Sequence, residues 1–442
     1  MRWFALVVLA AACGDNLRAF ESGSRLEAIV DVGGDDAVAI AYYRDTERGV
    51  DCQFQRDARS EWRCLPRARV ELAGYSDDAC SVPIYECRDC TAPQAVLLEA
   101  GCGGAVATPV ALVETTRPLF IRVGELCLHA EYPPGDYYTT ESQPLDGYIG
   151  ATFEDHLVTY QLGTRTLVAD DGTREMFHHA YERGGARDCS FGGGMVEPCL
   201  PGTRGSTEGQ AFYFEDAACS SRAAFSVKPN DPRSCPPPTH VRFEGGVHRV
   251  TSIGDRAFER SPIDSSCVST EGAELAFYAI GAVDESLPRA EAISVGTGDA
   301  RPVYHAAEGM PIAFAHRWID AADATLCTPL ATVAGRRCIG RSLSLFGSDI
   351  RYGDVACSVE LAPNPDGALY ALRWEGVTVP REVSARSTVA SIHALRSYPA
   401  TEMYEMRDGF CALSPEPVVL MAFVGAPLDL QTFPSVEQRP AR

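Results

Sequence analysis

Cysteines recur with a fixed period along this chain, and that period constrains the fold more than any other feature. The segment Tyr75–Ser81 has the pattern aromatic-x-Asp-x-Ala-Cys-Ser, which returns at Phe214–Ser220 and at Tyr352–Ser358. The motif cysteines are 139 and then 138 residues apart. Internal repetition of this kind is typical of repeat architectures. Three further cysteine positions keep nearly the same offsets, and the repeated set is Cys52, Cys64, Cys80 and Cys127; Cys189, Cys199, Cys219 and Cys267; Cys327, Cys338, Cys357 and Cys411.

The repeat predicts three tandem units, which we place at residues 23–154, 155–296 and 297–442. The 39 glycines and 29 prolines imply frequent turns, and the apolar runs between them are short. We therefore expect an all-β fold with about eight short strands per unit, in two groups of four. Two arrangements stay open. The three units close into a six-bladed β-propeller, or each is a small β-sandwich or barrel domain in a row.

The N-terminus is typical of an export signal. An apolar run over Trp3–Ala12 leads directly to Cys13, and it is too short to span a bilayer. The stretch Leu9–Cys13 resembles the lipobox of bacterial lipoproteins. That resemblance implies a signal peptide over 1–12, a lipid on Cys13 and a tether over 13–22. It also implies a place in the cell envelope, facing the periplasm or the cell surface. Gly14, the residue directly after Cys13, favours sorting of the anchored protein to the outer membrane.

Seventeen cysteines favour an oxidising compartment. Without Cys13, sixteen remain and can pair completely. In the third unit we expect Cys327–Cys338 and Cys357–Cys411, although four cysteines allow three schemes. Only Cys87-x-x-Cys90 has the spacing of a zinc knuckle, so we expect disulfides rather than metal or another cofactor. The additional disulfide candidates outside the repeated set are Cys87, Cys90, Cys102 and Cys235.

No catalytic residue can be assigned from the sequence. The repeated Asp77, Asp216 and Asp354 are expected to cap backbone N–H groups. The pairs His178-His179 and His240/His248 have no counterpart in the other units and do not form a metal motif. The net charge of −21 argues against nucleic acid as a partner. Sixty acidic residues leave a pair of catalytic carboxylates open.

The lipobox, together with Asp51-Cys52-Gln-Phe54, Arg63-Cys64-Leu-Pro66 and the three Cys-Ser motifs, resembles uncharacterised Cys-rich repeat lipoproteins of myxobacterial type. The resemblance implies location and architecture and no activity. We expect a non-enzymatic binding or structural module of the cell envelope, held on the membrane by its lipid, with an unidentified protein or glycan ligand. The alternative is a hydrolase of envelope or extracellular polymers that uses carboxylates on a propeller face.

Overall fold

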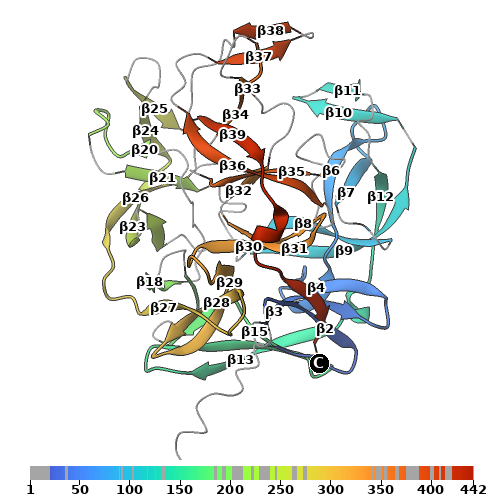
Figure 1. Ribbon diagram of the computed structural model, residues 1–442, viewed down its shortest axis with the longest axis vertical. Coiled ribbons are helices and arrows are strands. Elements are labelled where there is room, and N and C mark those ends of the chain that lie inside the picture. Colours follow the sequence, from blue (N-terminus) through green and yellow to red (C-terminus); the bar gives the residue numbers. More distant parts are fainter. Residues whose placement is uncertain are drawn as a thin grey trace, which may run out of the picture.

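The protein is built almost entirely of β-strands (Figure 1). Two 3-10 turns, η1 (Leu145–Gly147) and η4 (Leu430–Thr432), are the only helices among the described residues, so the expected all-β class is confirmed. The computed structural model describes residues 20–441 except for 35–37, 89, 91–92, 102–103, 117, 125, 131–135, 184–186, 192–195, 202–212, 221–222, 228–238, 244–245, 261–265, 272–275, 341, 345–350, 353–355, 364–367, 375–387, 399–402, 408–409 and 414–420.

A ring of antiparallel strands, which we call the base, connects all three units. Its strands pair in order β2-β3-β4-β5, and the following strand β13 pairs with both β5 and β14. In the same way β27 pairs with β18 and β28, and β40 pairs with β2, which brings the end of the chain back to its start. The base strands are β1 (Phe20–Glu21), β2 (Leu26–Val32), β3 (Val38–Asp45), β4 (Val50–Arg56), β5 (Trp62–Pro66), β13 (Gly150–Leu157), β14 (Leu162–Ala169), β15 (Arg174–Met176), β16 (Ala180–Glu182), β17 (Arg187–Ser190), β18 (Val196–Pro198), β19 (Leu200–Pro201), β27 (Arg289–Ser294), β28 (Ala300–Ala307), β29 (Met310–Asp320), β30 (Leu326–Thr332), β31 (Gly335–Gly340) and β40 (Glu437–Pro440).

Each unit also carries a lobe, a second set of strands inserted after its last base strand. The third lobe is joined to the base by the parallel pairing of β30 with β36. The spatial strand order is the same three times: β11-β10-β6-β7-β12-β9-β8, β25-β24-β20-β21-β26-β23-β22 and β38-β37-β33-β34-β39-β36-β35. The lobe strands are β6 (Arg69–Tyr75), β7 (Pro83–Arg88), β8 (Gln94–Gly101), β9 (Gly104–Glu114), β10 (Leu119–Val123), β11 (Leu126–Ala130) and β12 (Tyr137–Ser142); β20 (Tyr213–Phe214), β21 (Ala223–Val227), β22 (His240–Phe243), β23 (Gly246–Gly254), β24 (Arg256–Arg260), β25 (Cys267–Glu271) and β26 (Ala276–Val283); β32 (Ser342–Ser344), β33 (Arg351–Tyr352), β34 (Glu360–Pro363), β35 (Tyr370–Trp374), β36 (Val389–Tyr398), β37 (Tyr404–Arg407), β38 (Phe410–Leu413) and β39 (Met421–Pro427). In Figure 1 the first lobe lies at the upper right, the second at the left and the third at the top.

This pairing does not confirm the propeller. Among the described residues the strands form sheets of 12, 7, 14 and 7 strands rather than blades of four. Separate domains in a row do not fit either, because neighbouring units share base strands. The expected boundary between residues 154 and 155 falls inside β13, which pairs with strands of both units. A repeat offset gives the period of a unit but not where the unit begins, and strand pairing between units leaves no trace in the spacing.

Disulfides hold each unit at two places. One joins neighbouring base strands, as Cys52–Cys64, Cys189–Cys199 and Cys327–Cys338. The other ties the motif loop of the lobe to a hairpin, as Cys80–Cys127, Cys219–Cys267 and Cys357–Cys411. The pairing expected for the third unit is therefore the one observed, and Cys87 is bonded to Cys90. Cys13, Cys102 and Cys235 lie outside the described residues.

So many disulfides indicate an oxidising, extracytoplasmic environment. In the described part of the chain, no helix has the length and apolar character needed to cross a membrane.

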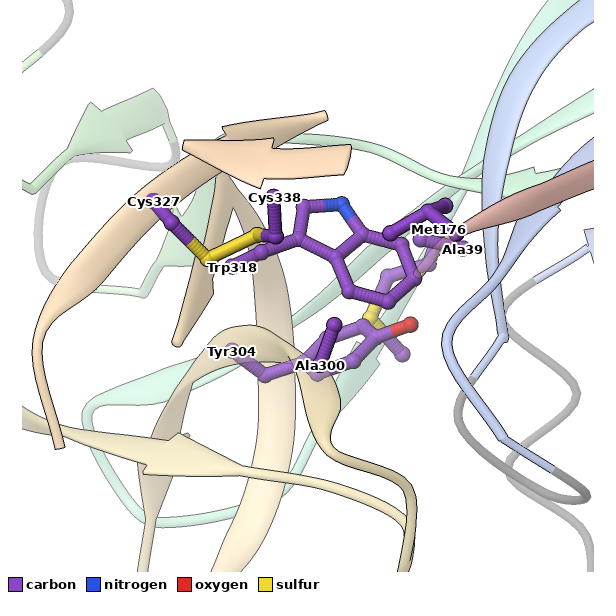
Figure 2. Packing of buried hydrophobic residues seen from close by; sticks show 8 residues of the cluster. Ala39, Met176, Ala300, Tyr304, Trp318, Cys327 and Cys338 are labelled. Carbon is purple, nitrogen blue, oxygen red and sulfur yellow. A yellow bond between two sulfur atoms is a disulfide. The ribbon is translucent and has the colours of Figure 1, made fainter. Parts of the chain in front are cut away.

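The core of the base joins side chains from all three units. Trp318 on β29 is 3% exposed and packs with Ala39 of the first unit and Met176 of the second. Figure 2 shows its indole between the Cys327–Cys338 disulfide on one side and Met176 on the other. Because this one cluster draws on three units, the units depend on each other for burial of their apolar surface.

Candidate functional site

The repeated Asp motif is a structural loop. The Asp77 carboxylate accepts hydrogen bonds from the Ser81 and Val82 backbone N–H groups at 2.8 and 3.1 Å, and from the Ser81 hydroxyl. These bonds, led by the one from Ser81, lower the pKa of Asp77. Asp216 accepts from Ala218 and Ser220 N–H groups at 2.7 and 3.3 Å. The expected capping role is confirmed for both, and Asp354 lies outside the described residues.

The motif cysteines explain why the loop recurs. Cys80, Cys219 and Cys357 all have left-handed backbones, with φ of 50°, 49° and 48°. Few non-glycine residues adopt this region, so the surrounding bonds must hold it. Arg122 donates to the Cys80 carbonyl at 2.7 Å, and Arg260 donates to the Cys219 carbonyl at 2.9 Å. The motif therefore stabilises a turn and its disulfide.

The paired histidines do not converge on one centre. His240 Nε2 lies 3.1 Å from Asp284, whereas His248 Nδ1 lies 3.0 Å from the Gly281 carbonyl oxygen. His178 and His179 pack against the ring of Phe177, with centroids 4.1 and 5.2 Å away. Among the described residues no three His, Cys, Asp or Glu side chains are grouped closely enough to hold a metal ion.

A half-buried acid lies where the N-terminal strand docks. Glu175 on β15 is paired with Phe20 of β1 and contacts the Tyr43 side chain, which is 1% exposed. Burial raises the pKa of Glu175 to about 7, and the hydrogen bond with Tyr43 opposes this rise. The same burial raises the pKa of Tyr43 well above its usual value.

The raised pKa of Glu175 predicts how the free energy of unfolding depends on pH. Because the folded-state pKa of Glu175 lies above that of the unfolded chain, its stabilising effect is complete below about pH 4.5 and is lost as pH rises to about 7. Glu175→Gln should remove this loss. Between pH 5 and pH 8 the free energy of unfolding of the variant should therefore fall by about 2 kcal/mol less than that of the wild type. Urea unfolding of both proteins at the two pH values measures the difference. Parallel pH profiles would contradict the assignment.

Three junctions between units have the same backbone hydrogen bond. The N–H groups of Cys64, Cys199 and Cys338 donate to the carbonyls of residues 149, 288 and 434 at 2.9, 2.8 and 2.9 Å. Two residues before each cysteine, the side chain differs, and Trp62, Glu197 and Arg336 occupy this position. The junctions are thus alike in backbone and different in chemistry.

At the first junction the position is aromatic. Trp62 packs edge-to-face on Phe153 and Phe177, with centroids 5.5 and 5.0 Å away. These side chains fill the space between the two units.

The second junction holds buried charge. Glu197 forms an ion pair with Arg242, and both side chains are nearly enclosed. Close by, His305 is 4% exposed, and its Nδ1 has no hydrogen-bond partner among the described residues. Burial lowers the pKa of His305 to about 4, and Arg317 and Arg242 contribute to this shift. The imidazole is therefore neutral at pH 7.

The third junction, where the ring closes, opens into a groove of about 630 Å³, a volume in the range of ordinary ligand sites. We call it the closure groove. It exceeds the other two described grooves, of 400 and 390 Å³. Its lining residues come from the β2–β3 turn, β31 and β40, and are Val32, Gly33, Gly34, Gly335, Arg336, Arg337, Ser435, Val436, Glu437, Gln438 and Arg439.

Glycine is required at one edge of the closure groove. A Cβ on Gly33 would overlap the Ala300 carbonyl and the Trp318 ring, and one on Gly34 would overlap Gly298. The absence of a side chain lets the first and third units approach backbone to backbone. The turn therefore forms one fixed edge of the groove.

The arginines of the closure groove are poorly neutralised. Arg336 is paired with Asp31 at 3.2 Å, whereas within the described residues Arg337 donates to the neutral Gln431 Oε1, at 2.7 Å, and to no carboxylate. The buried Nε atoms of Arg336 and Arg337 have no hydrogen-bond partner among the described residues. The Arg439 side chain makes no hydrogen bond or ion pair with any of the described residues. Against these three arginines stand two carboxylates, Asp31 and Glu437, so the groove carries a small local excess of positive charge in a chain of net charge −21.

None of these groove residues was identified from the sequence. Arg336-Arg337 is a visible basic doublet directly before Cys338, but Arg439 lies about a hundred residues further on. Only ring closure by β40 brings them together. A cluster of this kind carries no motif, so the sequence holds no signal for it beyond the doublet.

Comparison with known proteins assigns the sequence to a protein family. The sequence matches a family of unknown function, DUF7481, over residues 15–255, which is more than half of the chain. No curated protein and no solved structure matches it. The matched range contains the first unit with its lobe, the base strands β14 to β19 of the second unit and part of the second lobe. The chain therefore belongs to the DUF7481 family of unknown function.

Proposed function

We propose that this protein is an exported, lipid-anchored module of the cell envelope that binds an anionic ligand in the closure groove. The observation that carries the proposal is the set of three groove arginines, two of which have no carboxylate partner among the described residues. Guanidinium groups bind carboxylate, sulfate and phosphate oxygens with charge-assisted hydrogen bonds. An acidic envelope polymer or a protein acid supplies that chemistry.

Binding fits the groove better than catalysis. General acid catalysis needs a carboxyl shielded from water, and bond cleavage needs a nucleophile or a second acid close by. Glu437 is the one carboxylate among the lining residues, and it is exposed. The buried Asp31 behind them is held by the side chains of Arg336 and Gln438. The three junctions also carry different side chains, Trp62, Glu197 and Arg336, so the protein has one anion-binding groove rather than three copies of it.

Affinity electrophoresis tests the anion site by charge. Wild-type protein is run in gels that contain polygalacturonate, dextran sulfate or uncharged dextran. We expect retardation by a charged polymer alone, with the carboxylate and sulfate gels identifying the preferred oxyanion. Arg439→Gln should weaken retention at least about tenfold, since a hydrogen bond to a charged group contributes about 1.5–3 kcal/mol and about 1.4 kcal/mol corresponds to tenfold.

Two variants make this prediction specific. Glu437→Gln removes a negative charge from the same groove and should strengthen retention. Arg59→Gln removes an exposed arginine elsewhere, one that lies 3.6 Å from Asp146, and should leave retention unchanged. Equal effects of Arg439→Gln and Arg59→Gln would show that the groove does not bind the polymer.

The lipid anchor is proposed from the residues before the described range. The apolar run over residues 3–12 and the following Cys13 support it, and the disulfides support export. Intact mass of protein from native membranes tests this part. We expect a chain that begins at Cys13 and carries acyl mass. A chain cleaved elsewhere and free of lipid would overturn the anchor and leave the anion site to be judged separately.

A further inference from the structure

A second groove lies at the second junction and differs in chemistry from the closure groove. Its volume is about 400 Å³, and it is formed by the β13–β14 turn, β27 and the β28–β29 turn. Its strand β27 and its β28–β29 turn correspond to β40 and the β2–β3 turn of the closure groove, whereas the β13–β14 turn has no counterpart there. We call it the Tyr160 groove.

An aromatic ring stands at the rim of this groove. Tyr160 is 81% exposed, the highest exposure among the large apolar side chains given for the described residues. The turn beneath it is rigid, since Thr159 Oγ1 accepts from the Gln161 and Leu162 N–H groups at 3.2 and 2.9 Å. The guanidinium of Arg183 lies 5.2 Å from the ring centroid and helps to hold the ring in place. Much of the ring surface stays open to a ligand.

Polar side chains with open hydrogen-bonding capacity surround the ring. Gln161, Arg289, Glu291 and Glu308 all line the groove and are exposed. None of the four has a side-chain hydrogen bond or ion pair within the described part of the chain. Together they offer an amide, a guanidinium and two carboxylates. This mixture of donors and acceptors matches a row of hydroxyl groups better than it matches a single charge.

We infer that the Tyr160 groove is a carbohydrate subsite, in which the Tyr160 ring packs on the apolar face of a sugar and the polar side chains bind its hydroxyl groups. Binding pockets combine an apolar or aromatic surface with a few converging polar groups, and this groove has both. A neutral sugar chain is the ligand that uses the ring and all of these hydrogen-bonding groups together. The inference rests on other residues than the anion site and does not depend on it.

Affinity electrophoresis with three neutral polysaccharides, laminarin, galactomannan and xyloglucan, tests the inference. We expect at least one to retard the wild-type protein. Tyr160→Ala should weaken that retention about tenfold, which corresponds to about 1.4 kcal/mol. Tyr160→Phe should retain most of it, because the ring face makes the contact. Phe410→Ala is the matched control, since Phe410 is an aromatic residue 76% exposed on the third lobe.

The outcomes separate this site from the closure groove. Arg439→Gln should not affect retention by the neutral polymer, and Tyr160→Ala should not affect retention by the charged one. Glu308→Gln should weaken neutral binding by a few-fold, because a neutral amide still donates and accepts. No retardation by any of the three polymers, or equal retention of Tyr160→Ala and Phe410→Ala, would overturn the inference.

Discussion

Replacing Trp318 by alanine is expected to lower the free energy of unfolding by about 3–5 kcal/mol, the usual cost of deleting a buried large aromatic side chain. Trp318 is 3% exposed and packs against residues from all three units, including Ala39 and Met176. Its loss leaves a cavity at the point where the units meet. The neighbouring disulfide and backbone fix the walls, so the cavity can collapse only in part.

Chemical denaturation of Trp318→Ala and of Tyr160→Ala measures this effect against a surface aromatic. Tyr160 is 81% exposed, and its removal should change stability by less than about 0.5 kcal/mol. We also expect the transition of Trp318→Ala to broaden, because the units no longer share a filled core. A stability loss below 1 kcal/mol would mean that the base does not depend on this cluster.

Removing the lobe disulfide of the third unit is the second large change. The pair Cys357→Ala and Cys411→Ala opens a loop of 54 residues, and the chain-entropy estimate for that length is about 4 kcal/mol. The matched control is Cys87→Ala with Cys90→Ala, which opens a loop of 3 residues and should cost less than about 2 kcal/mol. Both variants lose two cysteines and one bond.

Limited proteolysis locates the effect. In the Cys357/Cys411 double variant we expect rapid cleavage within the third lobe, while the base and the first two lobes stay protected. The motif cysteine itself has φ of 48°, and without its bond the left-handed turn has less to hold it. Uniform cleavage across all lobes would show instead that this disulfide stabilises the whole molecule.

The features that could be predicted from the sequence are those that occur in each of the three units. The cysteine offsets predicted three like units and the disulfide pairs of the third unit, and the structure contains both. These features depend on local turns or on equal spacing, which a single sequence displays directly.

What the sequence did not predict arises from pairing between distant strands. Each unit holds a base and a lobe rather than two blades, and β40 returns to β2 across more than 400 residues. The closure groove exists only because of that pairing. The raised pKa of Glu175 is similar, since its neighbours Phe20 and Tyr43 approach it only after folding. Repetition suggests equal units, whereas the junction side chains Trp62, Glu197 and Arg336 make them different.

Calorimetric titration with trigalacturonate and with sucrose octasulfate tests the anion site most directly, because it counts sites. We predict one equivalent bound per chain for the probe whose oxyanion the groove prefers, with an affinity that falls as salt rises. That heat should disappear in Arg337→Gln combined with Arg439→Gln. Three equal sites per chain, or no heat with either probe, would contradict a single anion-binding groove at the closure of the ring.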